Sequence, residues 1–290
     1  MTADQPLSLD AQVSLLRRRG MVVEDRHRDD LYNSNYYRLA AYWRNHQRDP
    51  SNGLNDFGSK VNLDEVLHTY NYEKALRSVL LDGLLTFEMT FKARFAYELA
   101  NSGGDVDVYE YLYESYYSAH GKATKSDVAS VVSSIRSDIN RSRDRFIKHY
   151  MSSSRQIPVW VGIEVLSFGT VSKMFALLAD QNVKKTLARS FRQSSHDMLA
   201  ANLYSLSVLR NVCAHGGRLW NATLSTQPSI KLHLQNQGPE FQLNSVWARI
   251  LVLNDLLLSA DPNSFEVESI LTVVNDYPEY KQAISRPFLQ

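Results

Sequence analysis

Cysteine is nearly absent from this 290-residue sequence, which contains one. A single thiol excludes an internal disulfide framework and a metal site built from several cysteines, and it is typical of a reducing compartment, so we expect a cytoplasmic protein. No apolar run approaches the roughly 18 residues of a membrane-spanning helix. The first residues also lack the basic and apolar segments of a secretory signal. We therefore expect no membrane partner.

An excess of charge is missing too, because 32 basic and 31 acidic residues leave a net charge of +1. This balance excludes a general polycation, so any contact with nucleic acid depends on a local basic patch. The chain is nevertheless 44% hydrophobic and 22% charged, a composition that supports a folded core.

Proline and glycine are scarce, with 8 and 12 copies, and they separate segments of helical periodicity. The pattern predicts an all-α fold, a bundle of four or five long helices. The longest helix is predicted over 62–99, where Leu76, Leu80, Leu84, Phe87, Phe91 and Phe95 form one apolar stripe. Other helices are predicted over 9–19, 29–43, 197–215, 246–258 and from Phe265, and over 157–179 either one helix or two joined near Gly169.

Turn-rich composition at 51–61 predicts a linker between a small N-terminal helical subdomain, 1–50, and a helical bundle, 62–290. A serine- and arginine-rich stretch predicts a peripheral helical insertion around 105–155, because serine is a weak helix former. The segment NSGGD, 101–105, is expected to end the long helix, whereas 222–244 is compatible with a strand pair or a loop.

The stretch LRNVCAHGGRLWN, 209–221, places polar side chains at the end of an apolar helix. Five residues separate Arg210 from His215, roughly 500° of helical rotation, so the two side chains diverge by about 140° and cannot pair within one chain. His215 precedes two glycines, a position that the helix dipole favours for histidine. The spacing alone is compatible with a polar helix end, with Cys213 and Ala214 packed inward, and with a site of chemistry.

The same stretch carries a resemblance to a known family. Arg210, Asn211, three further residues and His215 match the R-x4-H signature of the HEPN superfamily. Three more segments, in the same order as in the family, complete a resemblance to the Abi-like abortive-infection proteins of the AbiD/AbiF type. These segments are NYYRLAAYW, LRSVLLDGLLTFEMTFKARFAYELA and PVWVGIEVLSFGTVSKMFALL, and the resemblance covers most of residues 10–260.

The resemblance implies a HEPN bundle that forms a homodimer and joins two R-x4-H ends across a two-fold axis. The implied site is a ribonuclease without metal or cofactor, in which a ribose 2′-OH attacks the adjacent phosphodiester. His215 would act as general base or acid, and Arg210 would stabilise the charged phosphate. Asn211 would orient the imidazole or the phosphate.

The flanking residues admit two interpretations each. By spacing, Glu88 and Lys92 are an ordinary i,i+4 ion pair, whereas the resemblance implies that Glu88 positions Arg210 or His215. Lys92 stands where the family usually has arginine, and Arg94 keeps the family pattern. Two residues after the motif, at family-typical places, would either bind RNA phosphate or brace the loop: Arg218 and Asn221.

Two further surfaces are compatible with RNA or with ordinary structure. The segment NYYRLAAYW, with Tyr37 and Arg38, would either stack bases or dock the N-terminal helices on the bundle. The tyrosines of 109–117 suggest an interface or a packing surface. A basic run would either follow RNA or form a solvated helix face, and it contains Arg136, Arg141, Arg143, Arg145 and Lys148. The remaining histidines show no metal-ligand spacing, so we expect no metal.

The first functional hypothesis is a metal-independent endoribonuclease that acts as a toxin-type antiphage effector. The alternative is an RNA-binding HEPN module with little or no cleavage, holding a noncoding RNA; an antitoxin is another possible partner. The intact Arg210, Asn211 and His215 favour the first hypothesis, because a purely binding protein has no need of them. A DNA-binding transcription regulator is disfavoured because no helix-turn-helix signal is present.

Overall fold

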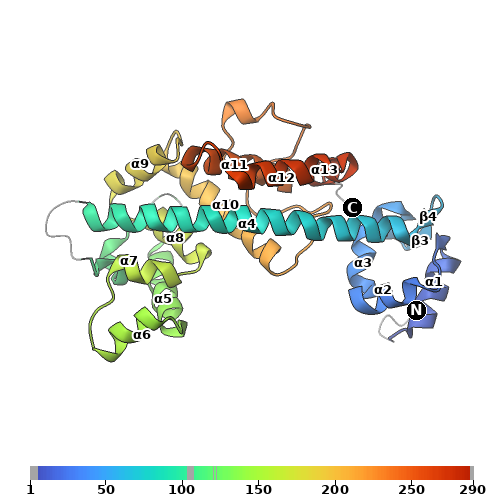
Figure 1. Ribbon diagram of the computed structural model, residues 1–290, viewed down its shortest axis with the longest axis horizontal. Helices are drawn as coiled ribbons and strands as arrows, with labels where there is room; N and C mark the ends of the chain where they lie inside the picture. Colours follow the sequence, from blue (N-terminus) through green and yellow to red (C-terminus); the bar gives the residue numbers. More distant parts are fainter. Residues whose placement is uncertain (1–5, 103–107, 120, 122, 288–290) are drawn as a thin grey trace. The chain divides into compact units, whose positions relative to one another are not determined.

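The computed structural model describes residues 6–102, 108–119, 121 and 123–287, and in this part of the chain it is almost entirely helical (Figure 1). Its thirteen α-helices are accompanied by two small two-stranded sheets, which confirms the all-α prediction. By the contacts between its residues the chain divides into two compact units, and the division falls between Leu76 and Arg77. No helix in the described residues is long and apolar enough to cross a membrane.

The first unit contains three short helices, two pairs of short strands and the beginning of α4. Strand β1 pairs with β4 in parallel, and β2 pairs with β3 in antiparallel orientation. The elements are α1 (Leu9–Arg18), β1 (Met21–Val22), α2 (His27–Ser34), α3 (Tyr36–Trp43), β2 (Gln47–Asp49), β3 (Leu54–Phe57), β4 (Val61–Asn62) and α4 (Leu63–Asn101).

Local capping explains where these first helices begin. Ser8 caps α1 as its type predicts, with its hydroxyl accepting from the Ala11 N–H at 3.2 Å. The region 29–43, predicted as one element, is two helices because Asn35 adopts a left-handed backbone with φ of 63°. The Asn35 side chain then accepts from the Tyr37 N–H at 2.9 Å and starts α3. Residues of the predicted linker form β3 and lead through β4 into α4.

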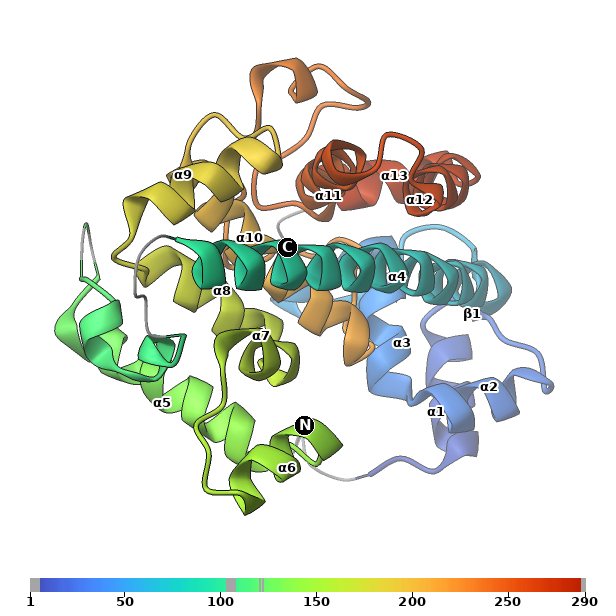
Figure 2. The same ribbon diagram turned by 60° about the vertical axis from the view of Figure 1, so that its left-hand side comes forward.

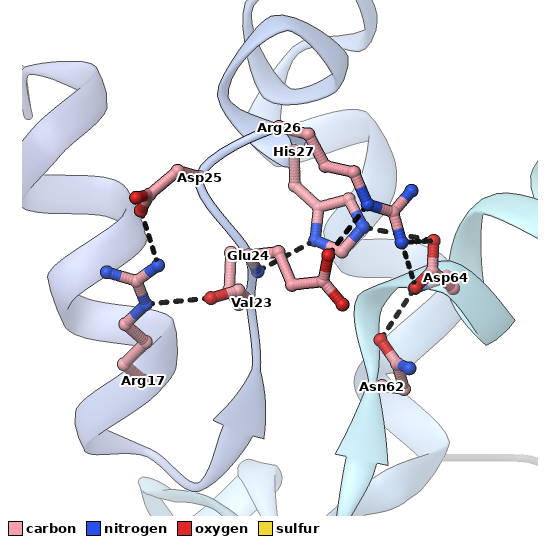
Figure 3. Close-up of polar contacts among 8 residues, drawn as sticks. All are labelled: Arg17, Val23, Glu24, Asp25, Arg26, His27, Asn62 and Asp64. Atoms are coloured by element: carbon pink, nitrogen blue, oxygen red, sulfur yellow. Dashed lines mark hydrogen bonds and ion pairs between the residues drawn. The ribbon is translucent and has the colours of Figure 1, made fainter.

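A buried histidine organises the polar contacts of the first unit (Figure 3). His27 is fully buried; its Nδ1 accepts from the Glu24 N–H at 3.0 Å, and its Nε2 lies 3.0 Å from Asp64 Oδ1. Because Nδ1 accepts, the Nε2 nitrogen carries the proton and donates it to Asp64. Arg26 binds the same carboxylate at 2.6 Å and Glu24 at 2.8 Å. We call Glu24, Arg26, His27 and Asp64 the His27–Asp64 cluster.

The positive and proton-donating partners in this cluster change the pKa of the Asp64 carboxylate. The hydrogen bonds from His27 and then Arg26 hold the pKa of Asp64 below its ordinary value. Asn62 adds a second tie, since its side chain accepts from the Asp64 N–H at 3.1 Å. The cluster therefore fastens the start of α2 to the first turn of α4.

The second unit surrounds the remainder of α4 with nine further helices in the described residues. Figures 1 and 2 show α9 and α11–α13 on one side of α4 and α5–α7 on the other, and α10 packs on α8, α9 and α11. The helices are α5 (Lys125–Arg141), α6 (Arg145–Ser152), α7 (Val159–Gly162), α8 (Phe168–Leu177), α9 (Gln181–Ser190), α10 (His196–Ala214), α11 (Val246–Ala260), α12 (Phe265–Asn275) and α13 (Pro278–Ser285).

The predicted stripe of α4 is the centre of this core. Leu80, Leu84, Phe87, Phe91 and Phe95 have no exposed surface, and Leu76, the last residue of the first unit, is equally buried. The phenylalanines contact rings from α8 and from the end of α9, at centroid distances of 5.5–6.1 Å. Burying one such ring contributes about 1.5–3 kcal/mol, so the stripe fixes where α8 and the end of α9 pack. The rings contributed by α8 and by the residue after α9 are Phe168, Phe175 and Phe191.

Some elements differ from the sequence predictions. Of the two possibilities for 157–179, the structure has the division near Gly169: it falls at Ser167, whose hydroxyl accepts from the Thr170 N–H at 3.2 Å and starts α8. The predicted insertion contains α5 and α6, and α5 packs on α8. Residues 222–244 form a loop with one short 3₁₀ turn, Leu232–Leu234, and helices α9 and α13 were not predicted. Gly103–Asp105, expected to end α4, lie outside the described residues.

Candidate functional site

The end of α10 is built by a specific helix-ending turn. The Gly216 N–H donates to the Cys213 carbonyl at 3.2 Å, and the Gly217 N–H donates to the Val212 carbonyl at 2.7 Å, the pair of bonds that defines a Schellman motif. Gly216 takes the left-handed position with φ of 65°, which glycine adopts without strain. At Gly217 a Cβ would lie 2.9 Å from Val212 Cγ1. The turn therefore explains both glycines: the backbone of Gly216 is left-handed, and a side chain at Gly217 would collide with Val212.

An arginine of α4 holds this turn in place. Arg77 is largely buried and donates from Nη1 to the Gly217 carbonyl at 3.1 Å. The contact joins residues 140 positions apart, so no local sequence pattern indicates it. Arg77 was missed by the sequence analysis, although it helps to set the direction of the loop that follows His215.

A buried carboxylate on α4 joins two cations. Glu88 Oε1 lies 2.8 Å from Lys92 Nζ, and Glu88 Oε2 lies 3.3 Å from Arg210 Nε. The second contact is an ion pair without the alignment of a hydrogen bond. Glu88 is only 6% exposed and Lys92 9%, whereas Arg210 is 27% exposed. Lys92 also donates to the Glu164 carbonyl at 3.4 Å.

Glu88 therefore pairs with Lys92, as the spacing predicts, and also contacts Arg210 of the motif. In the described chain no ion pair joins Glu88 to His215. Two cations share one anion, so this small group, Glu88, Lys92 and Arg210, keeps an excess of positive charge. We call it the Glu88 triad.

The other motif residues face outward from the last turns of α10. Arg210 Nη1 lies 3.4 Å from Asn211 Oδ1, a long hydrogen bond, and Asn211 is exposed. His215 is exposed, and within the described residues its imidazole makes no hydrogen bond or ion pair. Cys213, between them, is buried. The last two turns of α10 are therefore compatible with both interpretations of the motif, a polar helix end and a site whose side chains are available for chemistry.

The supporting residues predicted from sequence divide into two groups. Arg94 donates to the Ser190 carbonyl at 2.9 Å and stacks on the Phe191 ring at 4.5 Å, so it joins α4 to the end of α9 and does not touch the Glu88 triad. Arg218 is exposed on the loop after α10, and Asn221 is half-buried with φ of 49°.

The two predicted RNA surfaces lie on helices other than α10, one in each unit. On α3 of the first unit Tyr37 is 87% exposed and Arg38 is also exposed, while Tyr42 and Trp43 pack inside that unit. In the second unit the basic run spans α5 and α6. Its members are Arg141, paired with Asp138 at 2.6 Å, and the exposed Arg136, Arg143, Arg145 and Lys148.

The tyrosine-rich segment is largely packed. Tyr111 and Tyr117 are buried, and the Tyr111 hydroxyl donates to the Ile157 carbonyl at 3.0 Å. Burial raises the pKa of Tyr117 well above its ordinary value and that of Tyr116 to about 12. Among the described residues, no group of three or more His, Cys, Asp or Glu side chains gathers where it could hold a metal ion.

Comparison with known families places these residues in context. A family model described as "Abi-like protein" matches residues 29–221, about two thirds of the chain, and its match ends at Asn221, directly after the R-x4-H turn. The chain belongs to the Abi-like protein family. This membership associates the Abi-like chain with abortive infection, a form of phage defence. No curated protein and no solved structure that was compared matches the chain.

Proposed function

We propose that this Abi-like protein is a metal-independent endoribonuclease of the HEPN type that acts as a toxin-like effector in phage defence. The observation that carries the proposal is the pairing of a positioned arginine with an uncommitted histidine at one helix end. Arg210 is held by the buried Glu88, and five residues later the imidazole of His215 is exposed and makes no hydrogen bond in the described chain.

Arg210 has the geometry of a phosphate-binding group. A guanidinium carries five N–H donors, and the contacts with Glu88 and Asn211 engage only part of them. The remaining donors are available to two oxygens of one phosphate, which a planar guanidinium binds well. The ion pair with Glu88 reduces the freedom of the Arg210 side chain, so less conformational entropy is lost when the phosphate binds.

His215 is suited to proton transfer, since imidazole is the side chain that ordinarily gains and loses a proton near neutral pH. One His215 takes the proton of the ribose 2′-OH as its oxygen bonds to phosphorus. The 5′ oxygen departs with a proton from a second His215, and the products carry a 2′,3′-cyclic phosphate and a 5′-OH. Arg210 stabilises the negative charge that gathers on the phosphate during the reaction.

The second histidine would come from a second copy of the chain. Within one chain the helical offset separates Arg210 from His215 by about 140°. Two large apolar side chains are exposed on the helices that carry Glu88 and the motif, and a shared interface would cover them: Met89, next to Glu88 in α4, is 61% exposed. Tyr204, on the same face of α10 as Asn211, is 50% exposed. A two-fold axis through this face would place both motifs together.

The central experiment incubates purified wild type and His215→Ala with total RNA in the presence of EDTA and maps the new ends. We expect wild type to leave 2′,3′-cyclic phosphates and His215→Ala to be slower by about 100- to 10,000-fold, the usual contribution of a proton-transfer group. His46→Ala, which removes an exposed histidine in the first unit, is the matched control and should cleave as wild type does.

A folded His215→Ala protein that cleaves at the wild-type rate would contradict the mechanism. Wild-type binding of RNA with no new ends would support the alternative, an RNA-binding module for a noncoding RNA. The two results separate cleavage from binding because both are read on the same RNA.

If two copies of the chain share the site, disrupting the dimer should also reduce cleavage. Met89→Glu places charge on the exposed apolar face and should lower both dimer formation and cleavage, measured by sedimentation and by end mapping. Met151→Glu, on α6 and 48% exposed, is the control and should change neither. A monomeric Met89→Glu protein with full cleavage would overturn the shared site.

A further inference from the structure

A positively charged groove lies at the start of α10, in the second unit. It encloses about 810 Å³ and is lined by the end of α9, the first turn of α10, residues 230–233 and one residue of α11. Since α10 has 19 residues and is about 28 Å long, this groove is at the opposite end of the helix from His215. Its polar lining includes Arg189, Arg192, Ser194, Lys231, His233 and Asp255.

The charge of the groove is not balanced by its own residues. Lys231 Nζ lies 2.6 Å from Asp255 Oδ2, and His233 is 3.8 Å from the other oxygen of Asp255. Arg189 and Arg192 are exposed and make no ion pair in the described chain. Three permanent cations therefore face one carboxylate, an arrangement that favours an anionic ligand.

The floor of the groove is a connected network of hydrogen bonds. Gln193, largely buried, donates to Asp255 Oδ2 at 3.1 Å and accepts from the Asn202 amide at 3.3 Å. Asn202, 1% exposed, accepts from the Ser229 N–H at 2.8 Å. These bonds connect the end of α9, α10, α11 and the loop at 222–244. The backbone that carries the cations is therefore held in place by buried hydrogen bonds.

The backbone at Arg192 takes a conformation that glycine more often adopts. The Arg192 N–H donates to the Arg189 carbonyl, and the Gln193 N–H donates to the Ala188 carbonyl. Helix α9 therefore ends in the same Schellman motif as α10. In α10 the left-handed residue is Gly216, whereas in α9 it is Arg192, with φ of 52°. Glycine fills this position without strain, and an arginine there keeps a guanidinium at the rim of the groove.

We propose that this groove binds the phosphate of a nucleotide, supplied by single-stranded RNA or by a free nucleotide. Arg189 and Arg192 would bind the phosphate, and the positive end of α10 adds to their attraction. Met198, Ile230 and the 79% exposed Leu232 offer an apolar surface for the base or ribose. The proposal does not require cleavage at His215.

The test measures binding by the full-length His215→Ala protein, so that RNA is not consumed. The probes are a fluorescein-labelled single-stranded 12-mer RNA and, in a second arm, GTP measured by calorimetry. Arg192→Gly and the double variant Arg189→Gln/Arg192→Gly are compared with Lys125→Gln, which removes one exposed charge on α5. Arg192→Gly should keep or raise the melting temperature, because glycine relieves the left-handed backbone.

For the probe that binds, we expect the double variant to weaken affinity about 10- to 100-fold. If RNA is that probe, the dependence of log affinity on log salt should also become shallower by about 0.7 per lost contact. Loss in the RNA arm assigns the phosphate to a strand, and loss in the GTP arm assigns it to a free nucleotide. Unchanged binding of both probes, or an equal loss in Lys125→Gln, would overturn the proposal.

Discussion

Two histidines, one in each unit, occupy opposite chemical situations. His27 is fully buried, with Nδ1 accepting from a backbone N–H and Nε2 donating to Asp64. His215 is exposed, and its ring makes no hydrogen bond in the described chain. An imidazole with both nitrogens engaged fixes structure, whereas an uncommitted one is free to transfer protons. Burial and partners, not residue type, therefore separate the structural histidine from the candidate catalytic one.

The carboxylates of the two units differ in the opposite direction, because the more buried carboxylate lies in the second unit. Asp64 and Glu88 each bind two cationic or proton-donating side chains, but Asp64 is 38% exposed and Glu88 only 6%. Arg26, one partner of Asp64, is 58% exposed and stays solvated when Asp64 is lost, whereas Lys92 would be left nearly buried without Glu88. The comparison predicts that the second unit depends more strongly on its carboxylate.

The largest expected effect is that of Glu88→Gln. Removing the charge leaves Lys92 and Arg210 without their anion, and we expect the free energy of unfolding to fall by roughly 3 kcal/mol, as for other broken buried pairs. Urea unfolding followed by circular dichroism measures it. Glu98→Gln, on the same helix and half-buried, is the control and should change stability by less than about 0.5 kcal/mol. Equal losses in both variants would remove the special role of Glu88.

Next in size is His27→Ala, with an expected loss of about 2 kcal/mol. The substitution leaves the Glu24 N–H without its acceptor and opens a cavity in the first unit. The matched variant is His215→Ala, which should unfold within about 0.5 kcal/mol of wild type, because the lost side chain is exposed. A destabilised His215→Ala beside an unaffected His27→Ala would reverse the comparison.

A smaller effect is expected at the turn that ends α10. Gly216→Ala forces a Cβ into a left-handed backbone with φ of 65° and should lower the free energy of unfolding by about 1 kcal/mol. Gly169→Ala provides a control of opposite sign. In α8 a Cβ at that position meets nothing closer than Ser167 Oγ at 4.0 Å, so better helix propensity should stabilise the protein by up to about 1 kcal/mol.

The smallest expected effect is a loss of the stability contributed by Asp64 at low pH. The pKa of Asp64 is lowered in the folded protein, so the carboxylate contributes stability above its unfolded pKa near about 4 and loses it as pH falls through the lower folded value. The difference in melting temperature between wild type and Asp64→Asn should therefore shrink as pH is lowered from about 5 to about 2. A constant difference over this range would show that the charge of Asp64 does not contribute.

The parts of the fold that sequence predicts are those with a local repeating pattern. The stripe from Leu76 to Phe95 determines α4, and the polar run at 210–215 marks the end of α10. Contacts between distant positions leave no such pattern: His27 and Asp64 are 37 residues apart, and Arg77 and Gly217 are 140. Helix α9 was missed because only Val183, Leu187 and Ala188 of its 10 residues are apolar, so its stripe is weak. The break at Asn35 was missed because that residue takes a backbone conformation more typical of glycine.

The single cysteine gives this molecule a built-in reporter. Cys213 is buried in the last turn of α10, two residues before His215, and every other position lacks a thiol. A thiol reagent added to the unmodified protein therefore reacts only when that turn opens. The rate of labelling reads the opening of the helix end directly, and a ligand or second copy that closes over the turn should slow it without any engineered probe.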